Sequence, residues 1–340
     1  MSKESDKIFY ELWFPRNTQH LTIIAPPSFD DLEDAKVTSP NYALLDNLGD
    51  RDSIFNIGKL LSRRYPKAII DLKCSEGLSN RSVPLNDNLV IIGGPGGSYN
   101  DNNGNNLKGN EVCWLLSVNF LKSKISYSND CENMILEGER VLPSKYDKRS
   151  KLMTLDYGYF SAFKNPFYSK TRVIMLHGIH TLGVLGATRV FDGGEQDSIN
   201  NLVGLKSYIE EHNPKAGYNF ETFFEVKVSQ GWITCPKLNP QDIWFFNETV
   251  STDNFSQNKG SNNDDNGLKD TIINIITIAS NNTTDYARKK SHKELINKIS
   301  LLTDDSMNIL EKIYSVCMKN KNIPENYIDE INTLLSSEAK

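Results

Sequence analysis

The stretch RVIMLHGIHTLGVLGA, residues 172–187, is the segment that decides the expected fold. Its first part is an apolar run that ends at Gly178, which is typical of a buried β-strand. Thr181 is then a candidate helix N-cap, and we expect a helix over residues 182–190. A buried strand, a glycine turn and a helix in this order make up the repeating unit of a parallel sheet covered by helices.

The same unit recurs on both sides of this stretch. Apolar runs predict strands at residues 21–26, 68–72, 88–94, 220–228 and 243–246, and residues 134–163 hold two or three further strand-like pieces. Helical spacing of apolar residues predicts helices over residues 50–65, 111–121 and 198–211. Strands that are apolar throughout suit a sheet buried on both faces. The sequence therefore predicts an α/β fold, a Rossmann-like three-layer domain with a mixed, mostly parallel sheet, over residues 1–247.

Beyond this domain the composition changes. Residues 248–267 are almost free of apolar side chains and rich in asparagine, which is typical of a flexible linker. Residues 268–340 regain apolar stripes at helical spacing and predict a small helical module. Asparagine also clusters at residues 100–110, and clusters of this kind are tolerated in solvent-exposed segments.

The composition argues against several classes of protein. The formal net charge of −5 disfavours bulk binding of nucleic acid, which needs a basic surface. No apolar run approaches the roughly 18 residues of a membrane span, and the charged first residues lack a signal-peptide core. Five cysteines without C-x-x-C spacing do not indicate a disulfide framework or a zinc knuckle. We therefore expect a cytoplasmic protein that binds neither nucleic acid nor membrane.

The loop GGPGGSYN, residues 93–100, follows a predicted buried strand and is the first candidate site. Glycines let the backbone approach a ligand closely and turn N–H groups toward an anion, and ligands bind at the carboxyl ends of strands in open α/β sheets. The loop lacks the G-x-G-x-x-G and Lys-Ser/Thr patterns, so a tight turn without a ligand is an equal alternative. Its candidate ligand-binding residues are Gly93, Gly94, Gly96, Gly97 and Asn100.

The turn after the strand at residues 172–178 is the second candidate site. The free N–H groups and the positive dipole end of a helix attract phosphate or carboxylate. Small residues at the helix start would allow such a ligand to come close. Gly178, Thr181 and Gly183 are therefore candidate ligand-binding residues.

Three side chains near this turn are candidates for acid–base chemistry. His177 and His180 flank the turn, and histidine titrates near neutral pH. Asp156 lies on a strand expected at residues 153–160 and could serve with them. Hydrogen bonding without catalysis is the alternative for each histidine. Their i, i+3 spacing without a matching carboxylate pair does not predict a metal site.

The two loops form one bipartite site if the strands that carry them are neighbours in the sheet. We then expect Gly183→Val to abolish stabilisation by a ligand without unfolding the protein. Asp50 and Asp52, at the start of the helix over residues 50–65, are interpreted as groups that favour the helix dipole or cap the helix.

The order of these pieces resembles an uncharacterised group of bacterial Rossmann-like α/β domains, often found in actinobacterial proteins beside helix-turn-helix segments. In that group a strand ends in a (C/G)GP loop, a D-Y-G-Y-like strand follows, and a further strand runs into (A/H)GIH-x-x-G-x-x-GA. The matching positions here are Gly94, Pro95, residues 156–159, Gly178, Ile179, His180, Gly183, Gly186 and Ala187. The chain departs from the group in its Asn-rich insert, its helical tail and the lack of a helix-turn-helix segment. The resemblance implies the fold and supplies no activity.

Two hypotheses of function follow. The first is a bacterial cytosolic protein that binds a nucleotide-like or NAD-derived anionic small molecule, as a sensor or effector in signalling or defence. Whether it is an enzyme stays open, as does the identity of the nucleotide or NAD-like cofactor. The alternative is a non-enzymatic adaptor or scaffold that meets a protein partner through its C-terminal helical module. Self-association is left open in both.

Overall fold

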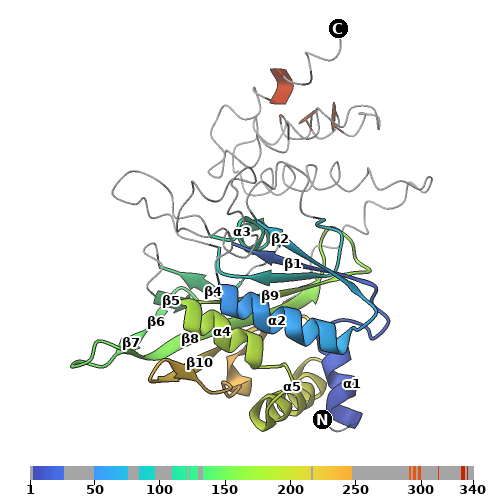
Figure 1. Cartoon of the computed structure of the whole chain (residues 1–340). Coiled ribbons are helices and arrows are strands. Elements are labelled where there is room, and N and C mark those ends of the chain that lie inside the picture. The colour runs from blue at the N-terminus through green and yellow to red at the C-terminus, as the bar shows by residue number, and fades with distance from the viewer. Residues whose placement is uncertain are drawn as a thin grey trace, which may run out of the picture. The chain divides into compact units, whose positions relative to one another are not determined.

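The structure is a computed structural model (Figure 1). It describes residues 3–26, 50–75, 84–95, 109–119, 121, 123–128, 133–215 and 217–246, with scattered positions between 291 and 335. Contacts divide the chain into two units, Met1–Glu76 with Asp87–Ser251 and Gly77–Asn86 with Thr252–Lys340. The second boundary falls inside the linker predicted at residues 248–267. Gly77–Asn86, which the sequence placed in the α/β domain, groups with the second unit.

The first unit is built on a mixed sheet. Its strands are β1 (His20–Ala25), β2 (Ile69–Cys74), β3 (Leu89–Ile92), β7 (Lys145–Tyr146), β8 (Met153–Lys164), β9 (Arg172–Gly178), β10 (Phe220–Ser229), β11 (Trp232–Ile233) and β12 (Ile243–Phe245). Within the described residues the order is β11-β10-β8-β9-β3-β1-β2, with β12 beside β10 and β7 beside β8. The central strands β2, β1, β3 and β9 run parallel, whereas β8 is antiparallel to β9 and β10. The predicted α/β class with a mixed, mostly parallel central sheet is confirmed.

Four helices pack on one face of this sheet. They are α1 (Lys3–Leu12), α2 (Arg51–Arg64), α4 (Thr181–Arg189) and α5 (Gln196–His212). Each buries an apolar stripe at helical spacing; in α2 the stripe is Ile54, Ile57 and Leu61. Figure 1 shows α2 beside α4 in front of the sheet, and the two helices are in contact. Alternate strand residues such as Phe160 and Leu176 complete this core.

The strand residues that alternate with Phe160, Leu176 and the rest of this core point to the other face of the sheet. This second face carries α3 (Glu111–Asn119), which contacts β3, and a small antiparallel sheet of β4 (Ile125–Tyr127), β5 (Asn133–Leu136) and β6 (Arg140–Pro143). On this face Tyr127 of β4 reaches His177 of β9. The sheet is thus covered on both faces, as the apolar strands predicted.

Most of the predicted elements of the first unit are present within a few residues of their expected bounds. The region 134–163 holds β5, β6, β7 and β8, which is more than the two or three pieces predicted. Helix α1 and strands β4 and β11 were not predicted. The 3₁₀ turn η3 (Pro240–Asp242), capped by the Asn239 side chain, leads into β12.

Only scattered positions of the second unit are described, and those beyond residue 247 are helical. Leu295, Ile299, Ile313 and Ile331 are buried there. Most of the predicted linker and helical module lies outside the described residues. None of the described helices combines the length and apolar character that crossing a membrane requires.

Candidate functional site

The carboxyl ends of β1, β3 and β9 lie next to one another, because β3 pairs with β1 on one side and with β9 on the other. Helix α2 follows β1 and leads into β2, which pairs with one side of β1. Strand β3 pairs with the other side of β1. Helix α2 covers one face and α3 the other. The strand order therefore reverses between β1 and β3, and such a switch point is where open α/β sheets bind ligands.

The two loops predicted from sequence meet at this edge. The Gly93 N–H donates to the Leu176 carbonyl at 2.9 Å. Gly93 has a φ of 87°, and a Cβ there would lie 2.8 Å from Pro26 Cγ, so the turn itself requires glycine. A Cβ on Gly94 would lie at an ordinary 3.8 Å from His177 Cβ. Gly94 therefore has room for a side chain, whereas Gly96, Gly97 and Asn100 lie outside the described residues.

The Asn110 side chain makes hydrogen bonds to β1, β3 and α3 at this edge. Its side-chain amide donates to the carbonyls of Ile24 and Ile92, the last or near-last residues of β1 and β3. Its Oδ1 accepts from the N–H groups of Val112 and Cys113 and so caps α3. One fully buried side chain thus fixes the ends of two strands and the start of a helix. Asn110 was not among the residues predicted from sequence, although an Asn directly before the predicted helix at Glu111 is a helix-start signal.

Asp50 is a functional candidate that was interpreted from sequence as a capping or helix-dipole residue. It precedes α2 in the left-handed conformation, with a φ of 55°, and its side chain makes no capping hydrogen bond to that helix. The carboxylate instead accepts a hydrogen bond from the Thr181 side chain at the start of α4. A Cβ on Gly93 would lie 3.1 Å from Asp50 Oδ2, so the carboxylate lies at the switch point. Burial raises the pKa of Asp50 to about 6, despite the opposing effect of Thr181.

His177 is held as a neutral, buried hydrogen-bonding residue. Its ring stacks on Tyr159 with centroids 3.8 Å apart and an interplanar angle of 11°. Its Nδ1 is paired with the Tyr127 hydroxyl. Burial lowers the pKa of His177 to about 3. An imidazole this weakly basic does not suit the acid–base role predicted for it.

The neutral state of His177 predicts a specific acid sensitivity. Its pKa is about 3 in the folded protein and about 6.5 in an unfolded chain, so between these values the unfolded state binds more protons. We expect the free energy of unfolding to fall by about 1.4 kcal/mol per pH unit from this residue as pH drops below about 6. Ring ¹⁵N chemical shifts of His177 should stay those of a neutral imidazole down to pH ~4. A protonation midpoint near 6 would contradict this assignment.

A second buried group, Glu221 of β10, lies on the same face as His177. Its carboxylate accepts from the Tyr159 hydroxyl at 3.0 Å, and also from the Ser123 hydroxyl and the Lys124 N–H. Burial raises the pKa of Glu221, while these hydrogen bonds oppose the rise. The bonds anchor the segment before β4 to the sheet. Glu221 therefore positions the small sheet that brings Tyr127 to His177.

Asp156 also has its hydrogen-bonding capacity taken up by the fold. Its Oδ2 accepts from the Gly183 N–H at 2.6 Å, and its Oδ1 accepts from the Tyr157 N–H at 2.9 Å and the Ser144 hydroxyl at 3.0 Å. The carboxylate thus caps the first turn of α4 from β8. Burial raises the pKa of Asp156, and the nearby His180 is among the groups that oppose the rise. These bonds favour a structural role for Asp156 over the catalytic role predicted.

His180 is the remaining predicted acid–base residue. It occupies the N-cap position of α4 and is partly exposed. Its Nε2 lies 3.3 Å from the Tyr146 hydroxyl. Of the two predicted histidines, His180 is therefore the one with a ring that solvent and a ligand can reach.

The glycines of the GIH-x-x-G segment serve close packing of α4 on the sheet. A Cβ on Gly183 would lie 2.2 Å from the Tyr157 carbonyl oxygen, and a Cβ on Gly178 would lie 2.5 Å from the Gly183 carbonyl carbon. Gly158 and Gly186 are equally crowded, by the side chains of Phe224 and Val226. The ligand-approach role predicted for Gly178 and Gly183 is therefore replaced by helix–sheet packing. Thr181 keeps its place at the proposed site, facing Asp50.

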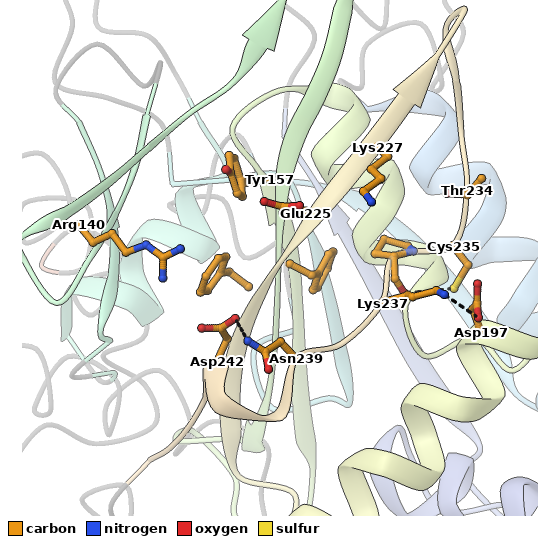
Figure 2. A pocket seen from close by; sticks show the side chains of 13 residues that line it. Arg140, Tyr157, Asp197, Glu225, Lys227, Thr234, Cys235, Lys237, Asn239 and Asp242 are labelled. Atoms are coloured by element: carbon orange, nitrogen blue, oxygen red, sulfur yellow. Dashed lines mark hydrogen bonds and ion pairs between the residues drawn. The ribbon is translucent and has the colours of Figure 1, made fainter.

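A separate pocket of about 390 Å³ lies beside β10 (Figure 2). Its lining residues are Arg140, Tyr157, Asp197, Phe223, Phe224, Glu225, Lys227, Thr234, Cys235, Pro236, Lys237, Asn239 and Asp242. Acidic and basic side chains balance there, and Figure 2 shows Lys237 paired with Asp197, their charged atoms 4.0 Å apart. Burial raises the pKa of the Cys235 thiol to about 12, so it is not a thiolate nucleophile. This pocket offers neither an unbalanced charge nor a reactive group.

The comparisons with known proteins give no relative: no family model, no curated protein and no solved structure matches the chain. The described residues contain no group of three or more His, Cys, Asp and Glu side chains that could hold a metal ion. The class supported by the fold is an α/β protein with a mixed, mostly parallel central sheet.

Proposed function

We propose that the first unit is a Rossmann-like domain that binds a nucleotide-like or NAD-derived anionic small molecule at the carboxyl edge of the sheet. The observation that carries the proposal is the meeting of the β3 and β9 ends at the switch point, with Asp50 and Thr181 beside them. The resemblance to bacterial α/β domains agrees with this but contributes no ligand.

The two kinds of polar group at this edge suit two parts of a nucleotide. The N–H groups of Thr181 and Leu182 have no acceptor in the described part of the chain. They lie in the first turn of α4, at the positive end of the helix dipole. They suit a phosphate or carboxylate. The Asp50 carboxylate is an acceptor suited to a sugar hydroxyl, the role that an acidic residue plays in many dinucleotide sites. A Cβ on Gly94, at the same edge, would make only an ordinary contact with His177.

Binding without turnover is the primary form of the proposal, as in a bacterial sensor or effector for signalling or defence. Because His177 is neutral and Asp156 caps α4, a hydrolytic version would depend on His180 as its acid–base group. Ligand binding would then be communicated to a partner or to the second unit.

The proposal predicts that a side chain at Gly94 blocks the site without disturbing the fold. Gly94→Leu should abolish thermal stabilisation by the probe NAD⁺, because the added side chain would occupy the proposed site beside His177. The melting temperature without ligand should change by less than about 3 °C, since a Cβ at this position makes only ordinary contacts. Gly94→Ala is the matched control and should retain most of the stabilisation. Equal stabilisation of Gly94→Leu and wild type by NAD⁺ would contradict the proposed site.

The second candidate is the adaptor. It is favoured by the buried, helical positions Leu295, Ile299, Ile313 and Ile331 in the second unit. In this form the α/β unit is a scaffold and the helical module meets the partner. Deleting residues 304–335 should then change the mass of the assembly in solution. An assembly unchanged by the deletion would count against the adaptor.

A further inference from the structure

The opposite edge of the sheet, where the parallel strands begin, holds a second and larger pocket of about 890 Å³. It lies between α1, the residues that follow α1, the start of β9 and the segment 214–219 that precedes β10. All of its lining residues belong to the first unit. Its size is within the range of about 300–1,000 Å³ that small-molecule sites occupy.

The pocket is basic although the chain as a whole carries a net charge of −5. Six cationic side chains line it, and Glu11 is the one acidic residue among the lining groups; the cations are Lys3, Lys7, Arg16, Lys164, Arg172 and Lys215. Lys7 is paired with Glu11 at 3.6 Å, and Arg16 is paired with Asp6. The other four have no carboxylate partner within the described chain. The lining of this pocket therefore carries an excess of positive charge.

Arg172 is the cation that marks the pocket as more than a basic surface. It begins β9, and its Nη2 donates to the Tyr218 carbonyl. Its Nε is buried and lacks a hydrogen-bond partner among the residues that the structure describes. Burial lowers the pKa of Arg172 to about 10, because no carboxylate offsets the lost hydration. A half-buried guanidinium whose Nε is unpaired and that has no counter-ion is costly, and an anion in the pocket would lower that cost.

The remaining wall of the pocket is apolar and aromatic. Tyr10, Trp13 and Tyr218 line it together with Pro15 and Pro214. The Arg16 guanidinium lies 4.6 Å from the centre of the Tyr10 ring, so a cation is held against that wall. Several cations beside an aromatic wall suit an organic molecule that carries more than one phosphate.

We propose that this amino-edge pocket binds a small molecule bearing a polyphosphate group, at a site distinct from the one proposed at the switch point. Arg172, held by its hydrogen bond to the Tyr218 carbonyl, supplies the fixed charge in the lining of the pocket. Lys164 and Lys215, both exposed at its rim, attract the phosphates, and the aromatic wall contacts the organic part. Inorganic and organic polyphosphates share the chemistry that the cations recognise, so the test includes both.

Isothermal titration of the full chain with tripolyphosphate and with ATP, at constant ionic strength, tests this inference. We expect saturable tripolyphosphate binding that Arg172→Met weakens at least tenfold. The rim variant Lys164→Gln/Lys215→Gln should weaken it similarly, and it guards against a folding defect in the Arg172 variant because both lysines are exposed. Lys59→Met, on the exposed side of α2 and outside the pocket, is the charge-matched control and should bind as wild type does. Tighter binding of ATP than of tripolyphosphate would assign the apolar wall to an organic group.

Two outcomes would overturn the inference. One is tripolyphosphate binding that is absent, or that neither the Arg172 variant nor the rim variant weakens. The other is tripolyphosphate binding that Gly94→Leu abolishes, because the phosphates would then lie at the carboxyl edge. The two proposals fail separately: Gly94→Leu should leave tripolyphosphate binding intact, and Arg172→Met should leave stabilisation by NAD⁺ intact.

Discussion

Gly183→Val is expected to destabilise the protein severely, by about 3 kcal/mol or more, and to lower its melting temperature by about 10 °C. The physical reason is backbone crowding: any Cβ on Gly183 would lie 2.2 Å from the Tyr157 carbonyl oxygen and 3.0 Å from Asp156 Oδ2. Relief requires α4 to move away from β8, which would also break the 2.6 Å hydrogen bond that caps the helix. The expectation from sequence that this substitution would spare the fold is therefore wrong.

Gly58→Ala is the matched control for this prediction. Gly58 also lies within a helix, but a Cβ there meets nothing within 4 Å. Alanine should therefore stabilise α2 by about 0.5–1 kcal/mol through its higher helix propensity. Urea or thermal unfolding of both variants measures the contrast. A Gly183 variant that unfolds like wild type would show that α4 does not pack on β8 as described.

Asp50→Asn is expected to stabilise the folded protein by about 2 kcal/mol at pH 7.5. The folded-state pKa of Asp50 is raised to about 6, above its ordinary value of 3.8, so ionisation costs stability as pH rises through this window. The cost is complete above about pH 6 and absent below about pH 3.8. Asparagine carries no charge, tolerates the left-handed backbone, and can accept the same hydrogen bond from Thr181.

The gain from Asp50→Asn should therefore grow between pH 4 and pH 6 and then level off. Asp52→Asn, in the exposed first turn of the same helix, is the control; it should be neutral or slightly destabilising, because it removes a favourable interaction with the helix dipole. Unfolding curves at pH 4 and pH 7.5 distinguish the two. Equal effects of both variants, or a loss of stability in Asp50→Asn at pH 7.5, would contradict the raised pKa of Asp50.

A carboxylate that weakens the fold at neutral pH is informative about function. Residues kept at a cost to stability are concentrated at binding and catalytic sites. The same substitution that stabilises the protein should therefore weaken binding at the switch point, because it replaces the acceptor proposed for a sugar hydroxyl. A gain in stability together with a loss of binding in Asp50→Asn would therefore support the proposed function.

Much of the fold could be predicted because its signals are local. The apolar runs of β1, β3 and β9, and the glycines at the ends of β3 and β9, are readable from sequence, and all three strands were placed to within a few residues. Helix α1 was missed although Ser5, Ile8, Phe9 and Leu12 form its buried stripe at helical spacing. Its many charged residues and short length concealed that period. The short strands β4 and β11 depend on their partners and carry little signal of their own.

The site could be predicted only in outline. The sequence indicated which loops end at the carboxyl edge, but the role of each glycine depends on neighbours from distant segments. A Cβ on Gly183 would clash with Tyr157 of β8, whereas a Cβ on Gly94 would make only an ordinary contact with His177, and nothing in the local sequence distinguishes the two glycines. The same holds for Asp50, because its raised pKa arises from burial by segments distant in the sequence, with the hydrogen bond from Thr181 opposing the rise. An aspartate at a helix start is ordinarily a capping residue, and the sequence was interpreted that way.

The most direct test of the central claim is native mass spectrometry of the full chain, purified without added nucleotide, for wild type and Gly94→Leu. We predict that wild type releases a phosphate-containing, nucleotide-like small molecule that is absent from Gly94→Leu folded to the same extent. A wild-type protein without such a molecule, which also shows no binding of ATP or NAD⁺, would contradict a ligand site at the meeting point of β3 and β9. So would release of the same molecule in equal amount by both proteins.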